Sequence, residues 1–265
     1  ALIALGYTMV YGIIQLINFA HGEVLMVGAL VAWTVIGVLQ EAVPGMPTWL
    51  ILLAATVAGC VVAAVLNIVI EKVAYRPLRN APRLAPLITA IGMSILLQAL
   101  AMVIWKPNVK SFPSMLPTDP YFIGEAVITP TQIMILVVTV MSLAVLMYIV
   151  HYTRIGRAMR ATAENPRVAA LMGVKPDAVI SATFAIGAVL AAIAGVMYAS
   201  NYGTAQHFMG FLPGLKAFTA AVLGGIGNLA GAVVGGVLLG LIEAIGSGYL
   251  GTLTGDPARL KQVMF

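Results

Sequence analysis

Two ionisable residues stand close together in an otherwise apolar part of the chain. His21 and Glu23 are two positions apart, and a histidine beside a carboxylate can bind a metal ion or transfer a proton. The zinc-binding pattern H-E-x-x-H needs a second histidine four positions away, and this sequence has none there. We therefore interpret His21 and Glu23 as residues of a structural element or a permeation pathway rather than as a catalytic pair.

A second short pattern suggests nucleotide chemistry. Residues 225–230 read GIGNLA and match the G-x-G-x-x-A pattern, but they lie between apolar runs rather than in a βαβ unit. The sequence also lacks the Gly-Lys dipeptide of a Walker A loop and the G-x-S-x-G motif of hydrolases. We predict that the chain is not an enzyme and binds no cofactor, so any ATP and Mg²⁺ would be bound by partner chains.

Composition excludes a soluble domain. Of the 265 residues, 61% are hydrophobic and only 9% are charged, which would leave a soluble protein with an apolar surface. The net charge of +5 comes from basic residues clustered in two loops, a distribution typical of membrane topology and not of nucleic-acid binding. Cys60 is the only cysteine and lies within an apolar run, so it can form neither an internal disulfide nor a multi-cysteine metal site.

The elements that must position these residues are membrane-spanning helices. We find no strand-like alternation of useful length, so we predict an all-α polytopic helical bundle that forms one transmembrane domain over residues 1–265. Because both ends fall within apolar runs, we expect this sequence to be a fragment. Seven or eight membrane segments are expected, some of them broken. The apolar runs are residues 1–20, 24–39, 47–70, 84–105, 129–150, 178–200 and 217–242.

Charge sets the orientation of the bundle. The loop at residues 71–83 carries four basic residues and one acid, and residues 151–177 carry five of the fourteen basic residues. Short basic loops remain in the cytoplasm, so both loops are predicted on that side. Two apolar runs separate the loops, and this even number agrees with a common side.

Residues 151–177 contain signals for a short helix. Asn165 is a favourable N-cap and Pro166 suits the first helical position, while Gly173 suits the C-terminal cap. These signals predict a two-turn helix over residues 166–172 that docks a cytoplasmic partner. The alternative is a solvated loop whose arginines set topology and contact lipid headgroups. The predicted docking residues are Arg160, Glu164, Asn165, Pro166, Val168, Ala169, Leu171, Met172 and Gly173.

Two apolar segments are interrupted, one near each end of the chain. In transporters, broken helices in corresponding positions mark the substrate pathway, because their free backbone groups must line protein or water. The alternative is an ordinary surface loop at residues 18–23 and glycines that serve helix packing alone, since Gly227, Gly231 and Gly235 recur every four residues. The predicted pathway residues are Asn18, His21, Gly22, Glu23, Gly224, Gly225, Gly227 and Asn228.

Several of these stretches resemble a known family. ALIALGYTMVYGI at residues 1–13, INFAHGE at 17–23, EKVAYRPLR at 71–79, AIGMSILLQ at 90–98 and KAFTAAVLGGIG at 216–227 are similar to the membrane permease subunit of branched-chain amino acid ABC importers of the LivH type. The family has more chain before residue 1 and a further span after residue 265.

The resemblance implies a multi-pass permease of the bacterial inner membrane that imports leucine, isoleucine or valine. It also implies a second homologous permease subunit, two cytoplasmic ATPase subunits and a periplasmic binding protein. The helix between Asn165 and Gly173 would then be the coupling helix that contacts an ATPase. Importers of urea and short-chain amides use similar permeases, so the substrate stays open at this point. A secondary transporter is a further alternative, although it would need ionisable residues deep in its spans.

Overall fold

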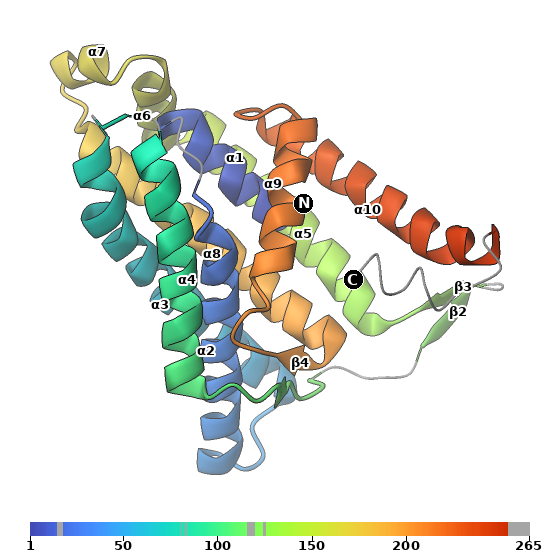
Figure 1. Ribbon diagram of the computed structural model, residues 1–265. Coiled ribbons are helices and arrows are strands. Elements are labelled where there is room, and N and C mark those ends of the chain that lie inside the picture. Colours follow the sequence, from blue (N-terminus) through green and yellow to red (C-terminus); the bar gives the residue numbers. More distant parts are fainter. Residues whose placement is uncertain (15–17, 80, 83, 116–119, 124–125, 254–265) are drawn as a thin grey trace.

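The computed structural model describes residues 1–14, 18–79, 81–82, 84–115, 120–123 and 126–253, which form a bundle of helices with a few short strands (Figure 1). Six helices in these ranges are long and apolar enough to cross a membrane. They are α2 (His21–Ala42), α3 (Thr48–Ile70), α4 (Leu84–Trp105), α5 (Pro130–Tyr152), α8 (Pro176–Tyr202) and α10 (Leu229–Leu253). Two shorter apolar helices are α1 (Leu2–Ile14) and α9 (Phe211–Leu223). The predicted all-α membrane fold is confirmed.

The centre of the bundle is formed by α2, α3 and α8, each of which packs against the other two. Glycines allow the backbones of these helices to come into direct contact. A Cβ atom on Gly28 of α2 would lie 2.7 Å from the Cα atom of Ala192 in α8. A Cβ atom on Gly59 of α3 would lie 2.8 Å from the carbonyl oxygen of Gly28. Small residues therefore hold the core together through backbone contact, as is common where lipid provides no hydrophobic drive for helix association.

The connections at one end of the bundle contain short strands that the sequence did not predict. β1 (Lys110–Ser111) pairs with β4 (Thr204–Ala205), and β2 (Tyr121–Ile123) pairs with β3 (Ala126–Ile128). The indole nitrogen of Trp33 donates a hydrogen bond to the carbonyl oxygen of Ser111 at 2.9 Å. Figure 1 shows these strands at the end opposite α7 (Pro166–Leu171). They are too short to change the fold class.

The two basic loops lie together at the other end, as predicted. Arg79 of the first loop forms an ion pair with Asp177, which ends the second. Most of the first loop is helical rather than irregular, because α3 continues into the π-helix η1 (Glu71–Tyr75) and the 3₁₀-helix η2 (Arg76–Leu78). Its last basic residue, Arg83, lies outside the described residues. The second contains an unpredicted helix, α6 (Arg154–Glu164), which Thr153 caps by accepting a hydrogen bond from the backbone of Gly156.

Both predicted interruptions exist. α1 ends at Ile14 and α2 begins at His21; residues 15–17 of the predicted first span lie outside the described residues. The expected short second helix is in fact 22 residues long and extends beyond residues 24–39 at both ends. α9 ends at Leu223 and α10 begins at Leu229, and Gly225 (φ 85°) and Gly227 (φ 94°) make the turn between them. The glycines that follow also pack, since Gly231 lies against the backbone of Gly224.

Candidate functional site

A groove runs between α4 and α9, which both contact the first turn of α2. Its volume of about 320 Å³ lies at the lower end of the range for small-molecule sites, roughly 300–1,000 Å³. On α4 the lining residues follow the helical period and so share one face. The groove is lined by Tyr7, Phe19, Ile91, Ser94, Ile95, Gln98, Phe208, Phe211, Gly214 and Leu215. It is an apolar channel with a small polar strip.

The polar strip leads to a buried carboxylate. Ser94 donates a hydrogen bond to the Oε1 atom of Glu23 at 3.0 Å, and the amide of Gln98 donates to the same atom at 2.7 Å. The Glu23 side chain is 1% exposed, and its Oε2 atom has no hydrogen-bond partner among the described residues. Glu23 therefore lies directly behind the floor of the groove without lining it.

The other residues of the first interruption serve packing. His21 is buried and faces Gly6 of α1, where a Cβ atom would lie 2.3 Å from the His21 Nε2 atom. Asn18 accepts a hydrogen bond from the hydroxyl of Tyr75 at 2.7 Å. Gly22 lies against the backbone of Gly210, just before α9. None of these side chains lines the groove, although Gly22 allows α9 to approach α2 closely enough to form it.

The structure does not bring the two interruptions together. Gly22 meets the start of α9, whereas Gly227 lies at its far end, 3.5 Å from the position of a Cβ atom on Gly12. The 13 residues of α9 separate the two by about 20 Å. Residues of the second interruption do not line the groove. The expected single path lined by both segments is not formed by this groove, because Gly224, Gly225, Gly227 and Asn228 form the turn between α9 and α10.

The predicted short helix of the second basic loop is present as α7, with the expected caps. The side chain of Asn165 accepts hydrogen bonds from the backbone nitrogens of Arg167 (3.0 Å) and Val168 (3.2 Å). Gly173 adopts a left-handed conformation (φ 85°) directly after the helix. Figure 1 shows α7 projecting from one end of the bundle. Leu171 is 87% exposed and Met172 is 80% exposed, so two apolar side chains project from the described surface.

One of the predicted docking residues faces inward instead. Ala169 is 3% exposed, because it lies on the face of α7 that packs against the rest of the loop and α8. We correct the expectation that its side chain offers a docking surface. Arg160 is exposed, and its guanidinium donates a hydrogen bond to the carbonyl of Val150, which fixes α6 to the end of α5. Glu164, Pro166 and Val168 remain exposed, together with Leu171 and Met172.

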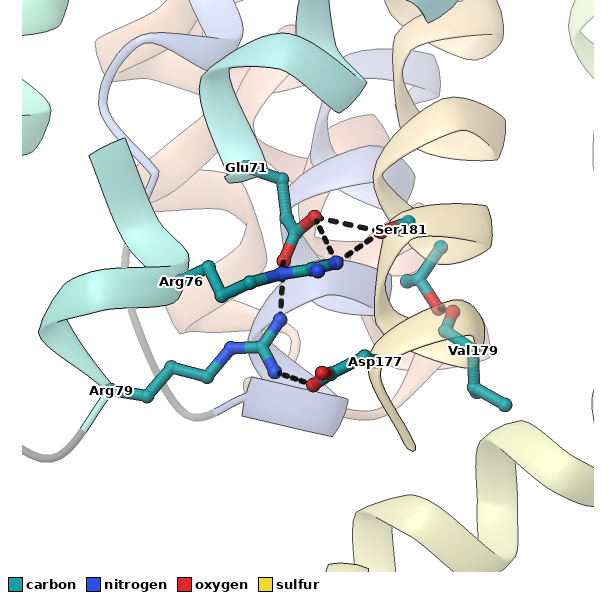
Figure 2. Close-up of polar contacts among 7 residues, drawn as sticks. Glu71, Arg76, Arg79, Asp177, Val179 and Ser181 are labelled. Carbon is teal, nitrogen blue, oxygen red and sulfur yellow. Dashed lines mark hydrogen bonds and ion pairs between the residues drawn. The ribbon is translucent and has the colours of Figure 1, made fainter. Parts of the chain in front are cut away.

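Next to α7 lies an ionic cluster that sequence reasoning missed. Glu71 is fully buried and forms ion pairs with Arg76 (3.2 Å) and Arg79. Ser181 of α8 donates a hydrogen bond to Glu71 at 2.7 Å. Figure 2 shows the carboxylate held between both arginines and α8, with Arg79 reaching on to Asp177. The one signal in the sequence was a single acid at the end of a long apolar run, directly before several basic residues.

Comparison with known proteins decides the family. The family described as "Branched-chain amino acid transport system / permease component" matches residues 1–265. The chain belongs to this family. It is 46% identical over 258 residues to the permease LivH of Escherichia coli (strain K12), a match that covers 95% of this chain and 83% of that protein.

Other relatives show the range of the likeness. The permease BraD of Pseudomonas aeruginosa is 48% identical over 260 residues, covering 95% of this chain and 83% of BraD. The ribose import permease RbsC of Escherichia coli (strain K12) is 25% identical over 253 residues, covering 92% and 73%. No solved structure matches the chain significantly. The protein is thus a multi-pass membrane permease and a component of a transport system.

The permease offers no metal centre within the part of the chain that the structure describes. No group of three or more histidine, cysteine, aspartate or glutamate side chains there is close enough to hold one ion. His21 and Glu23 belong to one helical turn, yet His21 points toward α1 while Glu23 points toward α4. His21 and Glu23 therefore do not act together at one site.

Proposed function

We propose that this permease is the membrane-spanning subunit of an ABC importer for leucine, isoleucine and valine, and that the substrate passes along the groove between α4 and α9. It catalyses no reaction of its own and takes its energy from separate ATPase subunits. The relatives LivH and BraD bear the names of branched-chain amino acid permeases, whereas RbsC, a more distant relative, is named for ribose. Because relatives differ in cargo, the lining of the groove must carry the argument for this one.

The observation that supports the proposal is the mixed lining of the groove. Ile91, Ile95 and Leu215, together with aromatic rings, form an apolar wall that suits a branched aliphatic side chain. Ser94 and Gln98 form the polar strip, which with the side chain of Glu23 directly behind it offers hydrogen-bonding groups to the polar end of an amino acid. Urea has no apolar part and would gain nothing from the wall.

Narrowing the groove should reduce transport. We expect Ile95→Trp to lower uptake of labelled leucine about tenfold or more, because the larger ring would occupy much of a cavity of about 320 Å³. Uptake is measured in proteoliposomes that contain the complete transport system. The matched control is Ile104→Trp, since Ile104 is equally exposed on the other side of α4 and does not line the groove.

Two outcomes would contradict this assignment. Equal uptake by the two tryptophan variants would show that leucine does not follow the groove. Transport of labelled urea by the wild-type system, without transport of leucine, would replace the proposed substrate by the alternative of urea or short-chain amides. Loss of uptake in both variants, with less protein in the membrane, would show that bulk on α4 acts through folding and would count against the groove.

The proposed mechanism is alternating access in the bacterial inner membrane. A second, homologous permease subunit would cover the open side of the groove, and a periplasmic binding protein would deliver the substrate at the end that carries the β-strands. Two cytoplasmic ATPase subunits would supply force through α7. Only four residues, 172–175, join α7 to α8, and the pair Arg79–Asp177 joins α8 to the end of α3. A displacement of α7 would therefore move α3 and α8, the two helices that pack most extensively against α2.

Docking at α7 can be tested at its most exposed residue. We expect Leu171→Asp to reduce both co-purification of the ATPase subunit and leucine uptake about tenfold. The exposed Leu171 side chain would be buried against the ATPase, and the variant would place a charge there. The conservative variant Leu171→Met should retain both. The stability of the permease itself should change by less than about 0.5 kcal/mol, because the residue contacts little of its own chain. Normal co-purification and uptake by Leu171→Asp would contradict docking through α7.

A further inference from the structure

A second cavity lies at the cytoplasmic end, outside the groove. Its volume is about 750 Å³, and it opens between the end of α3 and the start of α8. The α3 side contributes Ile68, Lys72 and Arg76. The α8 side contributes the segment that follows α7. The lining residues there are Val174, Lys175, Pro176, Asp177, Ala178 and Ser181.

The cavity carries a net positive charge. The charged residues that line the cavity, counted together with the residues linked to them by ion pairs, are four cations and two anions. Their net charge is +2. The cations are Lys72, Arg76, Arg79 and Lys175, and the anions are Glu71 and Asp177. Both anions are bound by arginines. Lys72 and Lys175 are exposed and form no ion pair within the described residues, so their charges are available to a ligand.

The length of α3 places this cavity at the depth of lipid headgroups. From Thr48 the helix continues through η1 and η2 to Leu78, a run of 31 residues. About 20 residues cross the hydrocarbon core, so residues beyond Ile68 extend into the headgroup layer. At the other end of the helix, Trp49 is largely exposed, as expected for an aromatic anchor at the opposite interface. Lys72 therefore lies one helical turn past the inner edge of the hydrocarbon.

An exposed apolar stripe leads directly to the cavity. Large aliphatic side chains on one face of α3 are more than half exposed on the described chain. The stripe consists of Val57, Val61 and Val65, which follow the helical period and share the face of Ile68 and Lys72. Ile68 lies one turn after Val65 and lines the cavity together with Lys72, so the stripe and the basic cavity form one continuous surface. An acyl chain along the stripe would place its headgroup at the cavity.

We propose that this cavity binds the headgroup phosphate of an anionic phospholipid of the cytoplasmic leaflet, with Lys72 and Lys175 as its principal contacts. Both charge complementarity and continuity with the apolar stripe favour a lipid over an acidic protein segment, which would gain nothing from the stripe. The bound lipid would bridge α3 and α8 beside the cluster around Glu71. It would thus stabilise the contact between the end of α3 and the start of α8, through which α7 is proposed to move the bundle.

The test is selective lipid binding by the purified complete transporter in a neutral detergent. The probes are spin-labelled phosphatidylglycerol and spin-labelled phosphatidylcholine. We expect the wild type to prefer phosphatidylglycerol, and the double variant Lys72→Gln with Lys175→Gln to lose about tenfold or more of that affinity, since each basic side chain near the surface contributes about fivefold. Binding of phosphatidylcholine should not change. The matched control is Arg154→Gln with Arg157→Gln, which removes the same charge from exposed positions on α6 outside the cavity.

Several results would overturn the proposal. An equal loss in the two double variants would mean diffuse attraction by the basic surface rather than a site. An absence of phosphatidylglycerol preference in the wild-type complex would mean that a partner subunit covers the cavity. Displacement of the labelled lipid by millimolar inorganic phosphate would show that the cavity selects a free anion and not a lipid. Persistence of the lipid under those conditions would support the headgroup assignment.

Discussion

Replacing Glu71 with alanine is expected to destabilise the permease by about 3 kcal/mol. Removing one partner of a buried ion pair costs about 3–5 kcal/mol, because the remaining charge stays buried without compensation. Here Arg76 loses its ion-pair partner, Arg79 keeps only Asp177, and Ser181 loses its acceptor. The lower end of the range applies, since the Arg76 side chain is 37% exposed and water can hydrate it.

Thermal unfolding of the purified permease in detergent measures this effect. A loss of about 3 kcal/mol corresponds to a fall in Tm of about 6–12 °C for a chain of this size. The matched control is Glu41→Ala, because Glu41 is exposed and takes part in no ion pair within the described residues. That variant should stay within about 0.5 kcal/mol of the wild type. Equal Tm values for the two variants would refute a structural role for the cluster.

Replacing Gly28 with leucine should have a similarly large effect for a steric reason. A Cβ atom at this position would approach the backbone of Ala192 to 2.7 Å, so α2 and α8 would have to separate. Overpacking of a core costs about 1–3 kcal/mol or more, and we expect the upper end because backbone rather than a flexible side chain is in the way. The same separation would open the contact between Gly195 and the carbonyl of Leu25 one turn away.

The control for this variant lies on the same helix. Gly37 of α2 has no neighbouring atom within 4 Å of a Cβ position among the described residues. Gly37→Leu should therefore leave the permease unchanged or stabilise it by about 0.5–1 kcal/mol, because glycine weakens a helix interior. The two variants are compared by Tm in detergent and by yield of monodisperse protein. A lower Tm for Gly37→Leu together with an unchanged Tm for Gly28→Leu would contradict the packing described for α2.

Much of the fold could be predicted because its signals are local. The apolar runs, the turn at Gly224–Asn228 and the caps of α7 each follow from residues within a few positions of one another. The common side of the two basic loops followed from counting apolar runs between them, and the pair Arg79–Asp177 confirms it. Helix ends were less accurate: α2 begins three residues earlier than expected, since His21, Gly22 and Glu23 form its first turn.

The candidate site was predicted only in part. Glu23 was expected on the pathway and lies just behind the groove, but Ser94 and Gln98 were not singled out. Polar residues on one face of an apolar helix do not reveal which neighbour they face. Ala169 was expected on a docking surface and is buried, because the orientation of a six-residue helix depends on the helices beneath it.

By itself the sequence determined a helical membrane permease with its basic loops in one compartment and a capped helix at that end. These properties depend on the cost of placing charge and free backbone groups in lipid, and on hydrogen bonds between near neighbours. Only the tertiary structure decided that Glu71 is bound to α8, 110 residues along the chain, and that α4 and α9 form one groove. Such contacts depend on how helices pack, which glycine backbones set here through close approach and no local signal specifies.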